Sequence, residues 1–135
     1  VDLAAQTIAV DRIPSPRIRF WSPTLVGGRP DPAFVAFLEF LERNGFDGTR
    51  SSAPPHAWAA ARLLIEGLRI AGATPSRTEL VRALESLREF PTGVTPPVSY
   101  GRYRRTGIRG ACLVTVDSES RSFVRAGDWV ELAPY

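Results

Sequence analysis

The sequence contains little of the chemistry that enzymes and metalloproteins commonly use. Its 135 residues include one cysteine, one histidine and no methionine, and all 17 basic residues are arginine. A lone cysteine excludes an internal disulfide, and one cysteine with one histidine is too small a ligand set for a zinc site. No apolar run approaches the roughly 20 residues that span a bilayer. We therefore expect no metal site, no cofactor and no membrane span.

The remaining composition is that of a globular protein. Hydrophobic residues make up 44% and charged residues 23% of the sequence, and the formal net charge is +3. The length fits a single domain over residues 1–135. Because the sequence has no methionine, Val1 is expected to come from processing or from within a longer reading frame. Residues 1–10 do not resemble a signal peptide, since they include Asp2 and no basic segment.

The sole histidine and the sole cysteine lack visible catalytic partners. His56 follows Pro55 at an expected helix start, where a surface or capping role is favoured over catalysis. Cys112 lies in an apolar, β-branched segment, where cysteine behaves as a small hydrophobe rather than as a thiolate nucleophile. The sequence therefore predicts no catalytic residue and a protein that is not an enzyme.

The first two thirds of the chain predict one strand followed by three helices. Residues 17–22 alternate apolar and basic side chains, which is typical of a short strand, and Pro23 ends it. Asp31 is an expected N-cap and Gly45 an expected stop for the first helix. Further helices are predicted over residues 56–71 and 76–90, the last from the capping-box sequence SRTE. The helical part thus occupies residues 31–90.

Two of these helices have wide apolar faces that need a covering surface. The expected buried residues are Phe34, Phe37, Leu38 and Leu41 in the first helix, and Trp58, Ala61, Leu64, Ile65 and Leu68 in the second. The remaining chain predicts a β part over residues 96–132. Its segments are an alternating Val98–Tyr100 and a hairpin of 112–116 and 121–126, with or without a third strand at 129–132. A sheet this small does not cover both helices, so their partner surface is expected elsewhere.

Residues 101–110, with the sequence GRYRRTGIRG, form the strongest concentration of positive charge. Arginines interleaved with Tyr103 suit the binding of single-stranded nucleic acid. A solvated loop between strands is the favoured interpretation, because phosphate binding usually draws on a wider basic face. Nucleic acid is therefore not the expected partner.

Several segments together resemble the type 1 periplasmic binding proteins of the leucine/isoleucine/valine family. The helix HAWAAARLLIEGLRIAG (56–72) is similar to a family helix with an aromatic residue, small residues, an apolar run and Ala-Gly. Residues 76–93 resemble the next helix and its Phe-Pro-Thr-Gly ending. Residues 97–101 and 111–129 resemble the strand and closing hairpin that follow. The resemblance covers about residues 17–132.

The resemblance implies an α/β fold, namely part of a Rossmann-like lobe. That part comprises one strand, three helices and a C-terminal β-hairpin or three-stranded β unit. It also implies that the chain is a fragment of a two-lobe receptor, with residues 17–24 as a hinge crossing beside the ligand cleft. Trp21 and Ser22 are then the expected ligand-binding residues, as an apolar wall and an orienting hydroxyl. A competing interpretation, equally compatible with the sequence, buries Trp21 between helix and strand.

The function implied is capture of an amino acid, amide or aromatic acid for ABC-type import. The partners would be this small ligand and a transporter permease, in the periplasm or outside the cell. Two alternatives from other classes remain open. One is a small nucleic-acid-binding or interaction domain that uses residues 101–110. The other is an assembly module whose helices are covered in a homo-oligomer.

Overall fold

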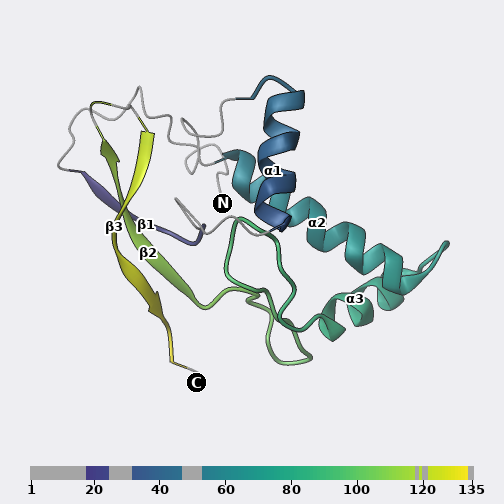
Figure 1. The fold of residues 1–135 in the computed structure, drawn as a ribbon. Coiled ribbons are helices and arrows are strands. Elements are labelled where there is room, and N and C mark those ends of the chain that lie inside the picture. The colour runs from purple at the N-terminus through teal and green to yellow at the C-terminus, as the bar shows by residue number, and fades with distance from the viewer. Residues whose placement is uncertain (1–17, 25–31, 47–52, 118, 120–121, 134–135) are drawn as a thin grey trace.

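The computed structural model describes residues 18–24, 32–46, 53–117, 119 and 122–133. The elements follow the order β1 (Arg19–Ser22), α1 (Pro32–Arg43), α2 (Ala53–Ala71), α3 (Arg77–Ser86), β2 (Gly110–Asp117) and β3 (Ser122–Glu131). The three helices lie on one side and the three strands on the other, with the segment 87–109 between them (Figure 1). No helix among these residues is both long enough and apolar enough to cross a bilayer.

The helix ends follow the local sequence signals. Gly45 and Gly72 terminate α1 and α2 with φ angles of 68° and 97°, the left-handed conformation that a helix-ending glycine adopts readily. The expected N-cap Asp31 lies outside the described residues. Helix α2 begins at Ala53, three residues before the expected start, because Pro54 and Pro55 occupy its first turn, where a missing N–H costs nothing.

The predicted capping box of α3 is confirmed. The Ser76 hydroxyl accepts from the Glu79 N–H at 3.3 Å, and the Glu79 carboxylate accepts from the Ser76 N–H at 2.7 Å. The Ser76 side chain and backbone hydrogen bonds hold the pKa of the Glu79 carboxyl below its usual value. This helix end is therefore fixed by a reciprocal pair of hydrogen bonds.

The strands form an antiparallel sheet of order β1-β2-β3, so the single N-terminal strand joins the C-terminal hairpin. Trp21 pairs with Leu113 across β1 and β2, and Asp117 pairs with Ser122 across β2 and β3. The interior side chains of β2 are Cys112, Val114 and Val116, which alternate with less buried neighbours.

Two predictions for the β part are wrong in detail. The expected strands 121–126 and 129–132 are one continuous β3, with a register shift opposite Cys112 and Val114. The shift is a bulge in which Arg125 donates to the Gly127 carbonyl at 2.8 Å and pairs with Asp128 at 3.1 Å. Residues 98–100 form no strand. Val98 makes one isolated bridge with Phe90, through two hydrogen bonds of 2.9 Å.

The core is built around a buried loop, residues 92–98. Val94 packs with Phe37 and Leu41 of α1 and with Ala59 of α2. The Trp58 indole N–H of α2 donates to the Thr92 carbonyl at 3.1 Å. A buried loop needs internal hydrogen bonds for its polar groups, and Thr92 and Thr95 supply them through a hydroxyl–hydroxyl contact of 2.5 Å.

The expected buried faces of α1 and α2 are only partly buried. Phe37 and Leu41 are in the core as predicted, but Leu38 is exposed. In α2 the predicted inward residues Ala61, Leu64, Ile65 and Leu68 are all exposed, with Ile65 at 65%. The physical reason is that α1, α3 and the buried loop cover the opposite side of α2, where Ala59 and Gly67 are buried.

We predict that Gly93→Ala destabilises the fold by about 3 kcal/mol or more, because two costs add. Gly93 has a φ of 85°, and an added Cβ would lie 2.6 Å from the Ala33 carbonyl oxygen. Gly72→Ala is the matched control, since its φ is 97° but an added Cβ meets nothing within 4 Å. Its expected cost is about 1 kcal/mol. Urea denaturation measures both, and equal losses would refute the close approach at Ala33.

Candidate functional site

The two residues expected at a ligand site, Trp21 and Ser22, lie on opposite faces of β1. Successive side chains of a strand point to opposite sides of the sheet. Trp21 is 61% exposed, whereas Ser22 is 7% exposed. The interpretation in which Trp21 is buried between helix and strand is therefore wrong for this chain. The two side chains do not converge on one surface, and only Trp21 offers its face to solvent.

The Ser22 hydroxyl is occupied by the turn that follows β1. It contacts the Thr24 hydroxyl at 2.8 Å and accepts from the Thr24 N–H at 3.3 Å. The Thr24 carbonyl in turn lies 3.6 Å from the Cys112 thiol of β2, which donates to it. This arrangement fixes the end of β1 against the centre of the sheet.

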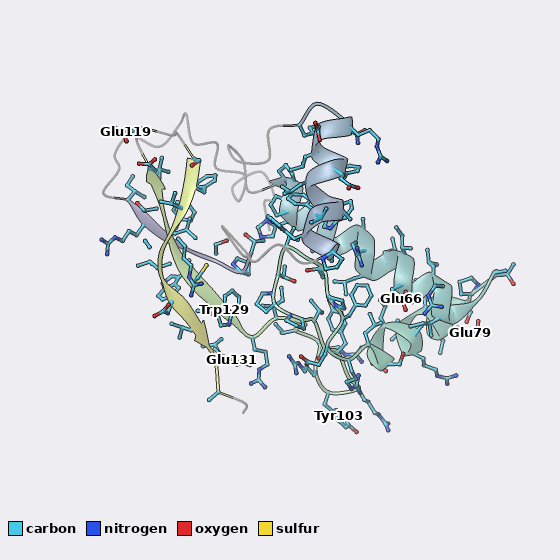
Figure 2. The ribbon with its side chains drawn as sticks, viewed as in Figure 1. Glu66, Glu79, Tyr103, Glu119, Trp129 and Glu131 are labelled. Atoms are coloured by element: carbon cyan, nitrogen blue, oxygen red, sulfur yellow. The ribbon has the colours of Figure 1, made fainter. Side chains whose placement is uncertain are left out.

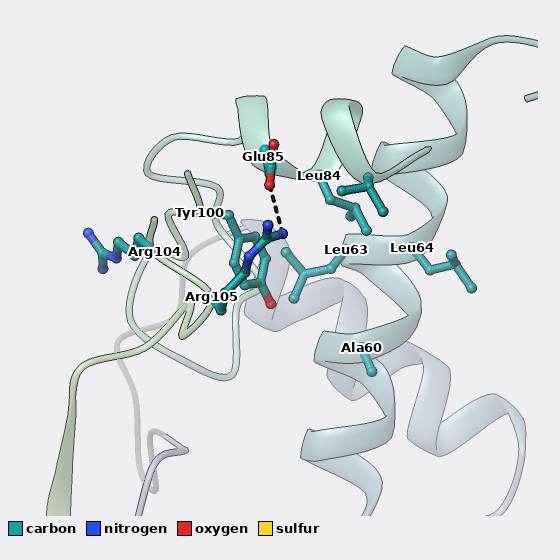
Figure 3. A pocket seen from close by; sticks show the side chains of 9 residues that line it. Ala60, Leu63, Leu64, Leu84, Glu85, Tyr100, Arg104 and Arg105 are labelled. Carbon is teal, nitrogen blue, oxygen red and sulfur yellow. Dashed lines mark ion pairs between the residues drawn. The ribbon is translucent and has the colours of Figure 1, made fainter. Parts of the chain in front are cut away.

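A cavity of about 400 Å³ opens between α2, α3 and the loop 100–105. Its lining residues are Ala60, Leu63, Leu64, Val81, Leu84, Glu85, Tyr100, Arg104 and Arg105. Figure 3 shows the Arg105 guanidinium reaching Glu85 beside the Tyr100 ring, while the Arg104 side chain extends away from them. The Arg105–Glu85 distance is 2.7 Å. Apolar walls with one ion pair at the rim suit a small, mainly apolar molecule.

Two local features hold these walls in place. Gly67 allows α2 and α3 to approach closely, since an added Cβ would lie 2.7 Å from a methyl carbon of Leu84. The Arg88 guanidinium donates to the backbone carbonyls of Glu85, Leu87 and Tyr100, and so ties the end of α3 to the loop. The position of the cavity is thus determined by helix packing and by one arginine.

The sole cysteine and the sole histidine lie on separate elements, Cys112 in β2 and His56 in α2. Cys112 is 1% exposed in the middle of the sheet, so it lacks the accessible setting that a thiolate nucleophile needs. His56 is exposed in the first turn of α2. Among the described residues, no three histidine, cysteine, aspartate or glutamate side chains gather as metal ligands. The expectation of a protein that is not an enzyme stays a prediction.

Sequence reasoning did not identify Arg88, Glu89 and Ser99 as a structural unit. Glu89 has a positive φ of 47°, which is unusual for a residue with a Cβ. The Ser99 hydroxyl stabilises this turn by donating to the Glu89 carboxylate at 2.6 Å and accepting from the Glu89 N–H at 2.9 Å. No sequence pattern signals a positive φ at glutamate. Ser99 and Glu89 are ten residues apart, so their contact is not evident from the sequence.

Comparison with known proteins gives a likeness of fold. No protein-family model and no curated protein matches the sequence. The structure is similar to the crystal structure of a branched chain amino acid ABC transporter from Thermus thermophilus with bound valine, with a TM-score of 0.68 and 14% identity. The match covers 85% of this chain and 33% of the other, so this chain spans about one third of that protein's length. It supports the expected resemblance at the level of the fold.

We predict that Trp21→Ala changes the free energy of unfolding of this chain by less than about 1 kcal/mol, because the side chain is mainly exposed. Phe37→Ala is the control for a core aromatic, with an expected loss of about 3–5 kcal/mol. Chemical denaturation followed by circular dichroism compares them. A loss at Trp21 as large as that at Phe37 would contradict an exposed position on β1.

Proposed function

We propose that the chain forms part of a solute-binding receptor that captures a small molecule for ABC-type import. The ligand would be an amino acid, an amide or an aromatic acid, and the receptor would deliver it to a transporter permease from the periplasm or the cell exterior. The observation that carries this proposal is the likeness of fold, with a TM-score of 0.68 over 85% of the chain. In this proposal residues 17–24 are a hinge crossing within a Rossmann-like two-lobe protein.

The exposed apolar face of α2 supports a larger protein around this chain. Leu64, Ile65 and Leu68 follow one another at helical spacing and are all exposed. Contiguous apolar surface of this kind marks a contact with another protein surface. We assign the remainder of the receptor lobe as its covering partner, because the similar transport protein is about three times as long as the matched part.

The proposed ligand contact is Trp21, on the edge strand of the sheet. An exposed tryptophan offers a large flat apolar surface together with an indole N–H donor. Ser22 holds the turn after it through Thr24, and its hydroxyl contacts a ligand only if one of those hydrogen bonds is exchanged. Trp21 is therefore the stronger candidate of the two for binding energy.

The proposal predicts saturable binding by the complete reading frame that contains this sequence. The test is calorimetric titration with the twenty amino acids, their amides and benzoate-type aromatic acids. Trp21→Ala is expected to weaken the best ligand by about tenfold or more while leaving the melting temperature nearly unchanged. Val130→Ala, an exposed apolar position on β3, is the matched control and should keep full affinity.

Failure of every ligand in this panel would overturn the proposed function. Binding that survives Trp21→Ala unchanged would preserve the receptor function but remove Trp21 from the ligand site.

For the 135-residue chain alone, we predict self-association through the exposed face of α2. Ile65→Asp with Leu68→Asp is expected to shift the chain toward monomer in sedimentation velocity, since two charges oppose apolar contact. The control is Val130→Asp with Leu132→Asp, which introduces the same charges at exposed apolar positions near the end of β3. Equal effects of the two pairs, or a wild-type chain that is wholly monomeric, would contradict this assignment.

A further inference from the structure

A second concave surface, which we call the basic groove, lies between α3 and the loop 101–105. Its volume is about 610 Å³. The lining residues are Arg77, Thr78, Val81, Arg82, Glu85, Arg102 and Arg105. Four guanidinium groups and one carboxylate therefore share one depression. The arginines of α3 widen the basic face that the sequence of residues 101–110 shows by itself.

Most of the positive charge in the basic groove is not neutralised by the protein. Glu85 pairs with Arg105 at 2.7 Å. Among the described residues, no carboxylate lies within ion-pair distance of Arg77, Arg82 or Arg102. The neighbouring Glu79 carboxylate accepts from the Ser76 N–H at 2.7 Å and also attracts Arg82 electrostatically, which offsets part of that one charge. Three like charges facing one hollow attract an anion, because the surrounding protein focuses their field.

The loop side of the basic groove is fixed in advance of any binding. Gly101 and Arg104 close the turn with two backbone hydrogen bonds of 3.1 and 3.0 Å. The Arg88 guanidinium holds the preceding Tyr100 carbonyl. The Arg102 guanidinium lies 5.5 Å from the centre of the Tyr103 ring, and Tyr103 projects from the tip of the loop (Figure 2). A preformed turn lowers the conformational entropy that the loop loses when an anion binds.

The other arginines of residues 101–110 serve the protein's own backbone. Arg104 donates to the carbonyls of Thr106 and Gly107, each at 3.3 Å. Arg109 donates to the Ala133 carbonyl at 2.7 Å. Arg104 and Arg109 line a neighbouring depression of about 290 Å³. In the basic groove, by contrast, Arg77, Arg82 and Arg102 donate to no carbonyl of the described residues. This distribution suits a compact anion and not an extended nucleic-acid strand, which needs a basic track.

We propose that the basic groove binds a diphosphate group, either free pyrophosphate or that of a nucleoside diphosphate. The four guanidinium groups exceed the one lining carboxylate, and this excess of positive charge matches a diphosphate better than a single carboxylate. Guanidinium forks bind phosphate oxygens in pairs, and the Thr78 hydroxyl adds a further donor. The volume lies within the usual range of small-molecule sites. The basic groove contains no residue of β1, so it is a different site from the one proposed for the receptor's ligand at Trp21.

The test is calorimetric titration of the 135-residue chain with pyrophosphate in 0.1 M sodium chloride. We expect saturable binding at one site per chain. Arg82→Gln with Arg102→Gln should weaken it at least about tenfold, since each substitution removes a charge-assisted hydrogen-bond donor. The control is Arg19→Gln with Arg43→Gln, which removes the same charge from β1 and α1, and it should keep the wild-type affinity within about threefold.

A parallel titration with adenosine diphosphate distinguishes the two sources of the diphosphate group. Tighter binding than pyrophosphate assigns a nucleotide, and equal or weaker binding assigns the free anion. Thermal melting by circular dichroism confirms that each double variant is folded. If Arg82→Gln with Arg102→Gln does not fold, Arg77→Gln takes its place with the same expected direction.

Three results would overturn the proposal. The first is the absence of saturable pyrophosphate binding at millimolar concentration. The second is an equal loss of affinity in the control pair, which would show a diffuse charge effect. The third is binding of a single-stranded oligonucleotide that pyrophosphate does not displace, which would assign this surface to a nucleic-acid strand.

Discussion

The hydrogen bond from the Trp58 indole to the Thr92 carbonyl, at 3.1 Å, ties the helices to the loop that leads to the sheet. It joins α2 to a loop that is itself buried, which is an unusual place for irregular backbone. Arg62 of α2 also lies over the Phe90 ring, 5.7 Å from its centre. The helices and the loop that leads to the sheet are thus fixed together at one end of α2. The loop's own threonines satisfy its polar groups, and no buried side-chain polar atom of the described residues is left without a partner.

The sequence was sufficient to predict the elements that local chemistry determines. Gly45, Gly72 and the Ser76–Glu79 capping box mark helix ends, and the β-branched segment around Val114 marks a strand. These signals act within one turn or a few residues, so they are readable without a fold. What the helices bury was not predictable in the same way. The apolar stripe of α2 predicts a contact, but only the packing of α1 and α3 decides that this chain leaves Ile65 exposed.

The candidate sites depend on contacts between residues that are distant in the sequence. Trp21 and Ser22 were identified through a family resemblance, and strand alternation was enough to separate them once β1 was known to pair with β2. Strand alternation and family resemblance were not enough to predict the basic groove. Its arginines come from α3 and from a turn about twenty residues later, and the contact of Arg88 with the Tyr100 carbonyl brings those segments together. Of the four arginines in residues 101–110, Arg104 and Arg109 donate to backbone carbonyls, whereas Arg102 and Arg105 line the basic groove.

The burial of Cys112 makes its reactivity toward thiol reagents a measure of how often the sheet opens. The thiol is 1% exposed, lies on the central strand opposite Ser22, and donates to the Thr24 carbonyl. A thiol reagent therefore reaches it only when the structure around the centre of β2 opens. When closing is faster than reaction, the alkylation rate is set by the equilibrium between the closed and the open structure. With one cysteine in the whole sequence, that rate reports on opening at a single position of the sheet.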